Sequence, residues 1–302
     1  MTNACPEPGI YYDISAEQYF AWEAVNNSRL GLMSKSSIHY KTGFKNEPTA
    51  SMALGSLCHA GVLEPLSLIQ RYTYMPDYSR DAENIASGGE RSFSKATKYV
   101  KQCEEQFRAV NRKKLIIDEA DYKKMLGISS ALSQCDRMRF LRKKGAAEVS
   151  IVWVDEKTGL RCKARADWVR DFQKDEPLIV LDLKTTQDAS IFEKSILKYS
   201  YHRQMAFYRR GFMAVTGKDP QMWICAVETV EPFGHRVAPM IDSAIEQGDH
   251  EVSDLLGKVR RCIDEDCWPG YDHPERWDLP EWKKQKESVE LTIGEETLAF
   301  GG

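Results

Sequence analysis

The sequence predicts an α/β protein, because the hydrophobic pattern changes period near residue 146. The preceding residues carry mainly helical signals. Strand patterns follow at 148–154, 160–170, 178–184 and 222–229. The strand at 178–184 is almost entirely apolar, which indicates a central position in a sheet. Two helices, 188–197 and 199–215, are expected between it and the last strand.

The helical signals begin at Ser15, which is followed by Gln18 and so predicts a capping box that opens a short helix ending near Trp22. Further helices are predicted at 28–34, 51–63, 91–112 and 118–135. Residues 79–90 are polar and carry a glycine pair, so we expect a loop or a lid there. A helix at 242–264 precedes a tail rich in Trp and Pro, which we expect to be irregular.

Length and composition place the chain among ordinary globular proteins. Its 302 residues are enough for one large domain or two modest ones, and 42% hydrophobic with 29% charged residues excludes a mainly disordered chain. We expect one domain over 1–240, with a helical part at 1–145 and a sheet core at 146–240. Residues 241–302 would be an acidic, helical and irregular extension of the same domain.

Nothing in the sequence marks the chain for a membrane or for secretion. No run of about 18 apolar residues occurs, and the N-terminus carries Pro6, Glu7 and Pro8 in place of a basic and apolar leader. The eight cysteines form no CxxC pair, so we expect reduced thiols, no iron–sulfur cluster and a cytoplasmic location.

Charge is distributed unevenly along the chain. The net charge of −3 excludes a uniformly basic nucleic-acid binder but leaves room for a local basic face. Residues 91–114 include eight basic and two acidic residues, whereas residues 246–302 include fifteen acidic and seven basic ones. This asymmetry favours one face for a polyanion, although ordinary solvated helix faces would give the same counts.

Asp182 and Lys184 stand at the end of the apolar strand. Because side chains alternate along a strand, both point to the same side of the sheet. Asp167 lies near the end of the preceding strand, and antiparallel pairing would bring it next to Asp182. Two neighbouring carboxylates share a proton or bind a divalent cation, and their hard oxygens suit Mg²⁺ or Mn²⁺. With a lysine to stabilise negative charge or activate water, this pattern favours phosphodiester hydrolysis. A surface ion pair is the alternative.

Three further features add to this pattern, and each also has a plain structural explanation. His59 lies on an apolar helix, where a core histidine is commoner than a metal ligand. Gln204 and Tyr208 are four residues apart on one helix and therefore share a face, as in any amphipathic helix. Glu148 opens the first strand and would add a carboxylate to the site.

Together these residues resemble the PD-(D/E)xK nuclease superfamily, and within it the RecB-like branch. Over about residues 10–230 the sequence is similar to the RecE-type nucleases (exodeoxyribonuclease VIII, C-terminal nuclease domain) and their phage relatives. The motifs are Gly55-x-x-x-His59 with Glu64-Pro65, Glu148, Lys163-x-Arg165-x-Asp167, Asp182-Leu183-Lys184-Thr185-Thr186 and Gln204-x-x-x-Tyr208, and the Asn27-Ser28-Arg29-Leu30 stretch is also similar. The resemblance implies a restriction-endonuclease-like core with a mixed central sheet flanked by helices, and it assigns residues 1–240 to a RecE-type exonuclease domain.

The resemblance also implies a role for each matching residue, and a Mg²⁺ cofactor for which Mn²⁺ can substitute. The implied catalytic residues are Asp167, Asp182, Lys184, Glu148, Gln204 and Tyr208. The implied metal ligands are His59, Asp167, Asp182 and the carbonyl of Leu183. The residues expected to contact DNA are Arg161, Lys163, Arg165, Arg29, Lys98 and Lys101.

The resulting prediction is a Mg²⁺-dependent exodeoxyribonuclease that digests linear double-stranded DNA, from 5′ to 3′, to expose single strand for recombination. The resemblance implies a homo-oligomeric ring on double-stranded DNA ends, a single-strand annealing protein as partner, no membrane, and a phage-related role in the cytoplasm of a bacterial host cell. An endonuclease of the same superfamily and a catalytically silent DNA-binding relative are the alternatives. Cleavage of closed circular DNA would identify the first, and absence of Mg²⁺-dependent activity the second.

Overall fold

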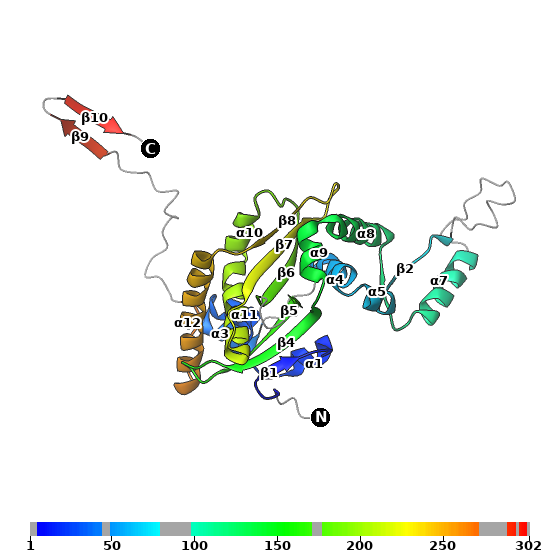
Figure 1. Ribbon diagram of the computed structural model, residues 1–302, viewed down its shortest axis with the longest axis horizontal. Helices are drawn as coiled ribbons and strands as arrows, with labels where there is room; N and C mark the ends of the chain where they lie inside the picture. Colours follow the sequence, from blue (N-terminus) through cyan, green and yellow to red (C-terminus); the bar gives the residue numbers. More distant parts are fainter. Residues whose placement is uncertain are drawn as a thin grey trace.

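The computed structural model of the protein describes residues 5–43, 49–78, 98–170 and 177–271 and the backbone of 289–293 and 296–300 (Figure 1). Its centre is a six-stranded sheet with the strand order β1-β4-β5-β6-β7-β8. These strands are β1 (Gly9–Tyr11), β4 (Ala146–Val154), β5 (Arg161–Arg170), β6 (Ile179–Thr186), β7 (Gln221–Glu228) and β8 (His235–Pro239). Within this sheet β6 and β7 are parallel and the other neighbouring strands antiparallel, so the predicted α/β class and mixed sheet are confirmed.

Helices cover both faces of the sheet (Figure 1). The first face packs against α2 (Asn27–Met33), α3 (Ser37–Thr42), α11 (Tyr201–Thr216) and α12 (Asp242–Asp264). The second packs against α4 (Ala50–Leu63), α8 (Glu119–Gln134) and α9 (Asp136–Arg142). The remaining elements are α1 (Ala16–Ala21), α5 (Pro65–Arg71), α7 (Lys98–Val110), α10 (Phe192–Lys198) and a small parallel pair, β2 (Tyr72–Tyr74) and β3 (Leu115–Ile117).

Strand β6 is buried on both faces, which explains its almost continuous apolar sequence. Leu181 and Leu183 pack into the core on the α4 and α8 side. Val180 packs into the core on the α11 side, and the side chain of Asp182 contacts α11 there. A carboxylate in such a position is removed from water and needs charged or hydrogen-bonding partners.

The antiparallel register of β5 and β6 sets the position of the next carboxylate. Trp168 pairs with Leu181, so Asp167 and Asp182 follow as neighbours at the end of the ladder. The chain then crosses over through α10 and α11 to β7, which pairs in parallel with β6. This crossover places α11 directly above the carboxylates.

Most long elements lie where the sequence places them. Ser15 caps α1 as predicted, accepting a hydrogen bond from the Gln18 N–H at 3.1 Å. The helices predicted at 28–34, 51–63 and 118–135 match α2, α4 and α8 to within one residue at each end. The short elements β1, β2, β3, β8, α3, α5 and α9 were not predicted, because so few residues carry too little periodicity.

The tail expected to be irregular contains two strands, β9 (Val289–Ile293) and β10 (Glu296–Phe300), which pair antiparallel with each other. Alternating apolar and polar residues in Val289–Ile293 are the strand signal for the first of them. The loop predicted at 79–90 and residues 91–97 of the predicted basic helix lie outside the described residues.

No helix in the described part of the chain is long and apolar enough to cross a membrane. All eight cysteines are free thiols, as expected from their spacing. Burial raises the pKa of the Cys58 thiol to about 12, so this sulfur stays protonated and unreactive at neutral pH.

Helix α12 lies close to the backbone of α11 at Gly248. A Cβ at this position would lie 2.4 Å from the backbone oxygen of His202 and 2.8 Å from the backbone nitrogen of Arg203. Only glycine fits such an approach, so Gly248 sets the spacing of the two helices and, with it, the position of α11 over the sheet.

Replacement of Gly248 by alanine should lower the free energy of unfolding by about 2 kcal/mol, because the added methyl group forces two helix backbones apart. Gly257→Ala on the same helix is the matched control, since a Cβ there meets nothing within 4 Å. Alanine should stabilise that position by up to about 1 kcal/mol through its higher helix propensity. Urea unfolding followed by circular dichroism measures both, and a Gly248→Ala protein as stable as the wild type would contradict this packing.

Candidate active site

Asp182 of β6 lies at the centre of a buried polar cluster, with its side chain only 2% exposed. The Nζ of Lys184 is 2.5 Å from Oδ2 of Asp182, and the Nε2 group of Gln204 donates to Oδ1 at 2.9 Å. The same amide donates to the hydroxyl of Tyr208 at 3.1 Å, one turn further along α11. The sheet and α11 thus bring together four of the predicted site residues.

Asp167 of β5 joins this cluster through the strand register. Its Oδ2 accepts a hydrogen bond from the backbone N–H of Leu183 at 2.7 Å. The sequence-based expectation that antiparallel pairing places Asp167 beside Asp182 agrees with this geometry.

His59 reaches the same point from α4, on the opposite face of the sheet. Its Nε2 donates to the carbonyl oxygen of Leu183 at 2.7 Å, and its Nδ1 lies 3.5 Å from Oδ1 of Asp167. Both ring nitrogens therefore face polar groups of the site, which distinguishes this histidine from a plain core residue.

Glu148 lies on β4 opposite Asp167, with a left-handed backbone φ of 53°. The ladder pairs on either side are Ala147 with Trp168 and Val149 with Ala166, so Glu148 stands outside the regular pairing. This conformation costs a residue other than glycine about 1 kcal/mol or more. Backbone strain of this kind is concentrated at functional sites. The Glu148 carboxylate accepts a hydrogen bond from Nε of Arg165 at 2.5 Å.

The charges of this cluster shift one another's pKa values. Burial raises the pKa of Asp182 to about 6, although the Lys184 ammonium opposes the shift. Burial alone would lower the pKa of His59, but the Asp167 carboxylate outweighs it and raises the pKa to about 9. For Lys184, burial is likewise outweighed by Asp182 and Asp167, which raise its pKa. Lys184 is therefore an ammonium at neutral pH and a source of positive charge, not a base.

His59, Glu148 and Asp167 form a group that could bind a metal ion. Each offers one ligand atom, and these atoms lie within 4.8 Å of one another. Two carboxylates and an imidazole fit a divalent cation, and the oxygen ligands favour Mg²⁺ or Mn²⁺ over softer metals. The donor set therefore fits the divalent cation predicted from the sequence.

This donor group differs from the ligand set that the resemblance implied. Asp182 is engaged by Lys184 and Gln204, and the carbonyl of Leu183 accepts the proton of His59. Glu148, which the resemblance implied as a catalytic residue but not as a metal ligand, lies among these donors.

The residues of this polar cluster lie in a region that matches a known protein family. The model of a PDDEXK-like domain of unknown function, DUF3799, matches residues 33–276. The chain belongs to this family. The match includes all the residues of the polar cluster and all of α12, and it confirms the superfamily predicted from the sequence. No protein of curated function matches this chain significantly.

One of the solved structures that resemble this chain shares its fold. A candidate exonuclease from Eubacterium rectale is 13% identical, with a TM-score of 0.52 over 94% of this chain and 97% of that one. A structure of LHK-Exo in complex with dAMP is 17% identical, with a TM-score of 0.25 over 54% of this chain and 83% of that one. At 13% identity, the likeness to the Eubacterium rectale protein shows a shared fold alone.

The PDDEXK-like cluster opens into a cavity of about 410 Å³, here called the site cavity. Its walls also include residues from the N-terminal segment and β5, namely Tyr19, Phe20, Asn26, Asn27, Ser28, Lys163 and Arg165. Phe20 is 71% exposed at this wall. Sequence reasoning did not select Tyr19 or Phe20, and the family-like stretch at Asn27 and Ser28 was the one signal for this segment.

Lys163, predicted to contact DNA, is buried and already bonded to the protein. Its side-chain ammonium donates to the carbonyl oxygens of Tyr19 and Trp22 at 2.7 and 2.6 Å. This geometry attaches α1 to β5 and leaves Lys163 little freedom to bind a phosphate.

Arg161 and Arg29 border a second, adjoining cavity of about 500 Å³. Arg161 donates through Nη1 to the carbonyl oxygens of Cys5 and Pro6, at 2.9 Å each. Arg29 donates to the carbonyl oxygen of Tyr40 at 2.7 Å and lies over the ring of the same residue. Both guanidinium groups thus stand near the site cavity, and their contacts with DNA remain predictions.

Lys98 and Lys101 are exposed on α7. Figure 1 places this helix at the edge of the molecule beyond α5 and β2, well away from β5 and β6. The structure therefore does not bring these lysines together with the polar cluster, and a role for them would require DNA that extends beyond the site cavity.

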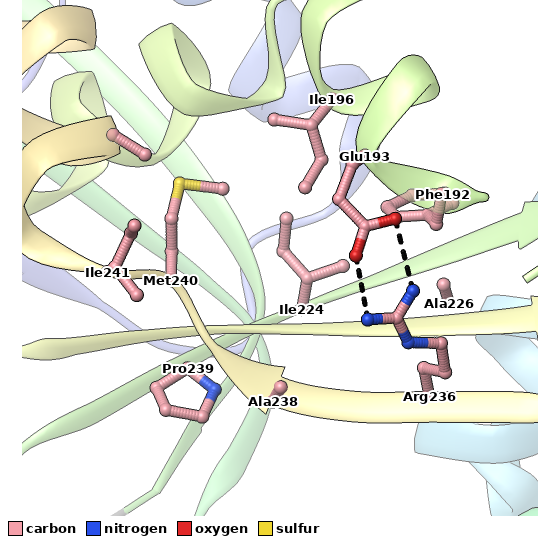
Figure 2. Close-up of a pocket in the computed structure, with 11 residues that line it drawn as sticks. Phe192, Glu193, Ile196, Ile224, Ala226, Arg236, Ala238, Pro239, Met240 and Ile241 are labelled. Atoms are coloured by element: carbon pink, nitrogen blue, oxygen red, sulfur yellow. Dashed lines mark hydrogen bonds and ion pairs between the residues drawn. The ribbon is translucent and has the colours of Figure 1, made fainter. Parts of the chain in front are cut away.

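Figure 2 shows another cleft, of about 480 Å³, beside α10, β7 and β8. Its walls are mainly apolar, with Phe192, Ile196 and Ile224 among them, and its charged residues Glu193 and Arg236 are paired at 2.7 Å. It shares no lining residue with the site cavity. The chemistry of the PDDEXK-like site therefore belongs to the site cavity.

Lys163→Met should lower the free energy of unfolding by about 2 kcal/mol, because two buried carbonyl groups each lose the hydrogen bond from the ammonium. Lys101→Met on exposed α7 is the control and should change it by no more than about 0.5 kcal/mol. Urea unfolding measures both. Unchanged stability of Lys163→Met, together with weaker duplex binding, would assign Lys163 to DNA instead.

Proposed function

We propose that this PDDEXK-like chain is a Mg²⁺-dependent exodeoxyribonuclease that digests linear double-stranded DNA. The observation that carries the proposal is the cluster of Asp167, Asp182 and Lys184 on adjacent strands, of which Asp167 and Lys184 line an open cavity. Family membership and the fold shared with a candidate exonuclease from Eubacterium rectale support a nuclease. Mn²⁺ is expected to substitute for Mg²⁺, because the same oxygen-rich donor set suits both ions.

The residues of the cluster have separate tasks in phosphodiester hydrolysis. A cation bound by Asp167, His59 and Glu148 would supply Lewis acidity and a more acidic water molecule. The Lys184 ammonium, protonated at neutral pH, faces the cavity and would stabilise the negative charge that develops on the phosphate.

Gln204 and Tyr208 have a positioning task. The amide of Gln204 fixes one oxygen of Asp182 while Lys184 binds the other, so the carboxylate has a single orientation. The hydroxyl of Tyr208 accepts a second hydrogen bond from the same amide and restrains its rotation. A carboxylate and a lysine held in this way need little reorganisation when DNA binds.

The finer parts of the proposal concern DNA ends. We expect digestion from 5′ to 3′, exposure of single strand for recombination in a phage-related process, a homo-oligomeric ring around the duplex, and a single-strand annealing protein as partner. The resemblance of the motif order to RecE-type nucleases supports these expectations. Exposed Phe20 at the cavity wall would suit a base at an opened end, since bases stack well on aromatic rings.

Lys184→Ala should reduce Mg²⁺-dependent degradation of linear duplex DNA by at least about 100-fold, because the phosphate loses the ammonium that would stabilise its developing negative charge. Asp182→Asn should have a similar effect. Linear and closed circular duplexes are compared with Mg²⁺ and with EDTA, and labels at the 5′ or 3′ ends give the direction of digestion. Lys157→Ala, in an exposed turn, is the control and should keep wild-type activity.

Three other outcomes of that assay would contradict the proposed exonuclease mechanism. Cleavage of the closed circle would identify an endonuclease. Intact DNA in every lane, with duplex binding retained, would identify a catalytically silent relative. Full activity of Lys184→Ala would remove the lysine from the mechanism.

Replacing Lys98 and Lys101 by alanine should weaken duplex binding and reduce its dependence on salt by about one unit of slope per lost phosphate contact. Fluorescence anisotropy of a labelled duplex over a range of salt concentrations measures the slope. Lys157→Ala, which removes one positive charge, is the control for each of the two single replacements. An unchanged slope would place α7 outside the path of the DNA.

A further inference from the structure

Arg165 has an incomplete set of partners at the wall of the site cavity. Its Nε donates to Oε2 of Glu148, and its guanidinium lies 5.7 Å from the ring centre of Tyr19. Its Nη1 is buried and donates to no group among the described residues. A guanidinium offers five donors in a planar fork, and a buried donor without an acceptor is costly. Arg165 therefore has an unused donor that could pair with a further anion once the guanidinium turns into the site cavity.

The neighbouring basic residues on β5 differ from Arg165 in what they bind. Lys163 and Arg161 donate to backbone carbonyl oxygens that are not among the candidate metal donors. A bound metal ion would therefore not compete for these contacts. Arg165 instead binds Glu148, a carboxylate that also belongs to the candidate metal donors His59, Glu148 and Asp167. A cation and Arg165 therefore compete for the same carboxylate.

We propose that Arg165 exchanges partners when a divalent cation binds. In the metal-free chain it neutralises Glu148, and a cation that takes Glu148 releases the guanidinium to bind a DNA phosphate. The phosphate matches the planar fork as well as a carboxylate does. This inference rests on the proposed function, since it names DNA as the anion, and it makes binding of the cation and of the phosphate mutually favourable.

The cation and the phosphate each favour binding of the other, because both act on the same pair of side chains, Glu148 and Arg165. The cation binds more tightly when a phosphate occupies Arg165, since the guanidinium then no longer holds Glu148. By reciprocity the duplex binds more tightly when the cation is present. Glu148 and Arg165 lie on neighbouring strands, and their side chains are 26% and 17% exposed, so the exchange needs only side-chain rotation within the cavity.

The first test measures Mn²⁺ binding by isothermal titration calorimetry, without DNA. Arg165→Gln should bind Mn²⁺ about fivefold more tightly than the wild type, because Glu148 is no longer held by a competitor. If Arg165 instead positions Glu148 for the metal, the same variant should bind Mn²⁺ more weakly, and that result would overturn the exchange. Arg161→Gln, the same change on the same strand, should leave Mn²⁺ binding unchanged.

A double-mutant cycle excludes a simple effect of charge. In a Glu148→Gln background, Arg165→Gln should no longer tighten Mn²⁺ binding, because the exchange acts through Glu148. A gain that persists in that background would show that Arg165 repels the cation at a distance and would contradict the proposal. Circular dichroism confirms that each variant is folded, and Arg165→Lys, which keeps the charge, provides a milder change at the same position.

The second test measures duplex binding by fluorescence anisotropy in a Lys184→Ala background, which keeps the DNA intact. Mn²⁺ should raise duplex affinity, and Arg165→Gln should reduce that gain at least threefold. An equal gain with and without Arg165 would overturn the exchange. Since neither measurement requires cleavage, a chain that shows this coupling but never cuts DNA would refute the proposed nuclease activity and leave the exchange standing.

Discussion

The register between β5 and β6 is the constraint on which the rest of the site depends. Trp168 pairs with Leu181, which places Asp167 against the backbone N–H of Leu183. A slip of one residue would turn the site face of β6 toward α4 and α8. Leu181 and Leu183 are fully buried on that side, so the slip would expose them and bury charges in their place. The apolar packing that stabilises the sheet thus also positions the carboxylates.

Burial of so many charges in one place is tolerated because acids and bases alternate. The pairs are Asp182 with Lys184, Asp167 with His59 and Glu148 with Arg165. A buried charge without a partner costs several kcal/mol, whereas a pair with good geometry compensates much of that cost. The same pairing keeps Lys184 protonated. It also leaves a compact group of donors, His59, Glu148 and Asp167, that could bind a divalent cation.

The N-terminal segment completes the site although it is remote in sequence. Helix α1 and the start of α2 supply Tyr19, Phe20 and Asn27 to the cavity wall. The buried ammonium of Lys163 attaches this segment to β5 through two carbonyl groups. Three basic residues that alternate along one strand therefore differ in their contacts. Lys163 binds backbone carbonyls, Arg161 binds backbone carbonyls and the Glu7 carboxylate outside the site, and Arg165 binds a carboxylate of the site.

The sequence by itself determined the local chemistry of this protein: the α/β class, the pairing of Asp182 with Lys184 across one strand residue, and the shared face of Gln204 and Tyr208. These follow from the periods of strands and helices. Only the tertiary structure decided which donors converge. His59 contacts Leu183 across 124 residues of chain, and Lys163 contacts Tyr19 across 144. Glu148 has a left-handed backbone conformation, which no pattern in the sequence indicates. Such contacts depend on how distant segments pack, and local periodicity carries no information about that.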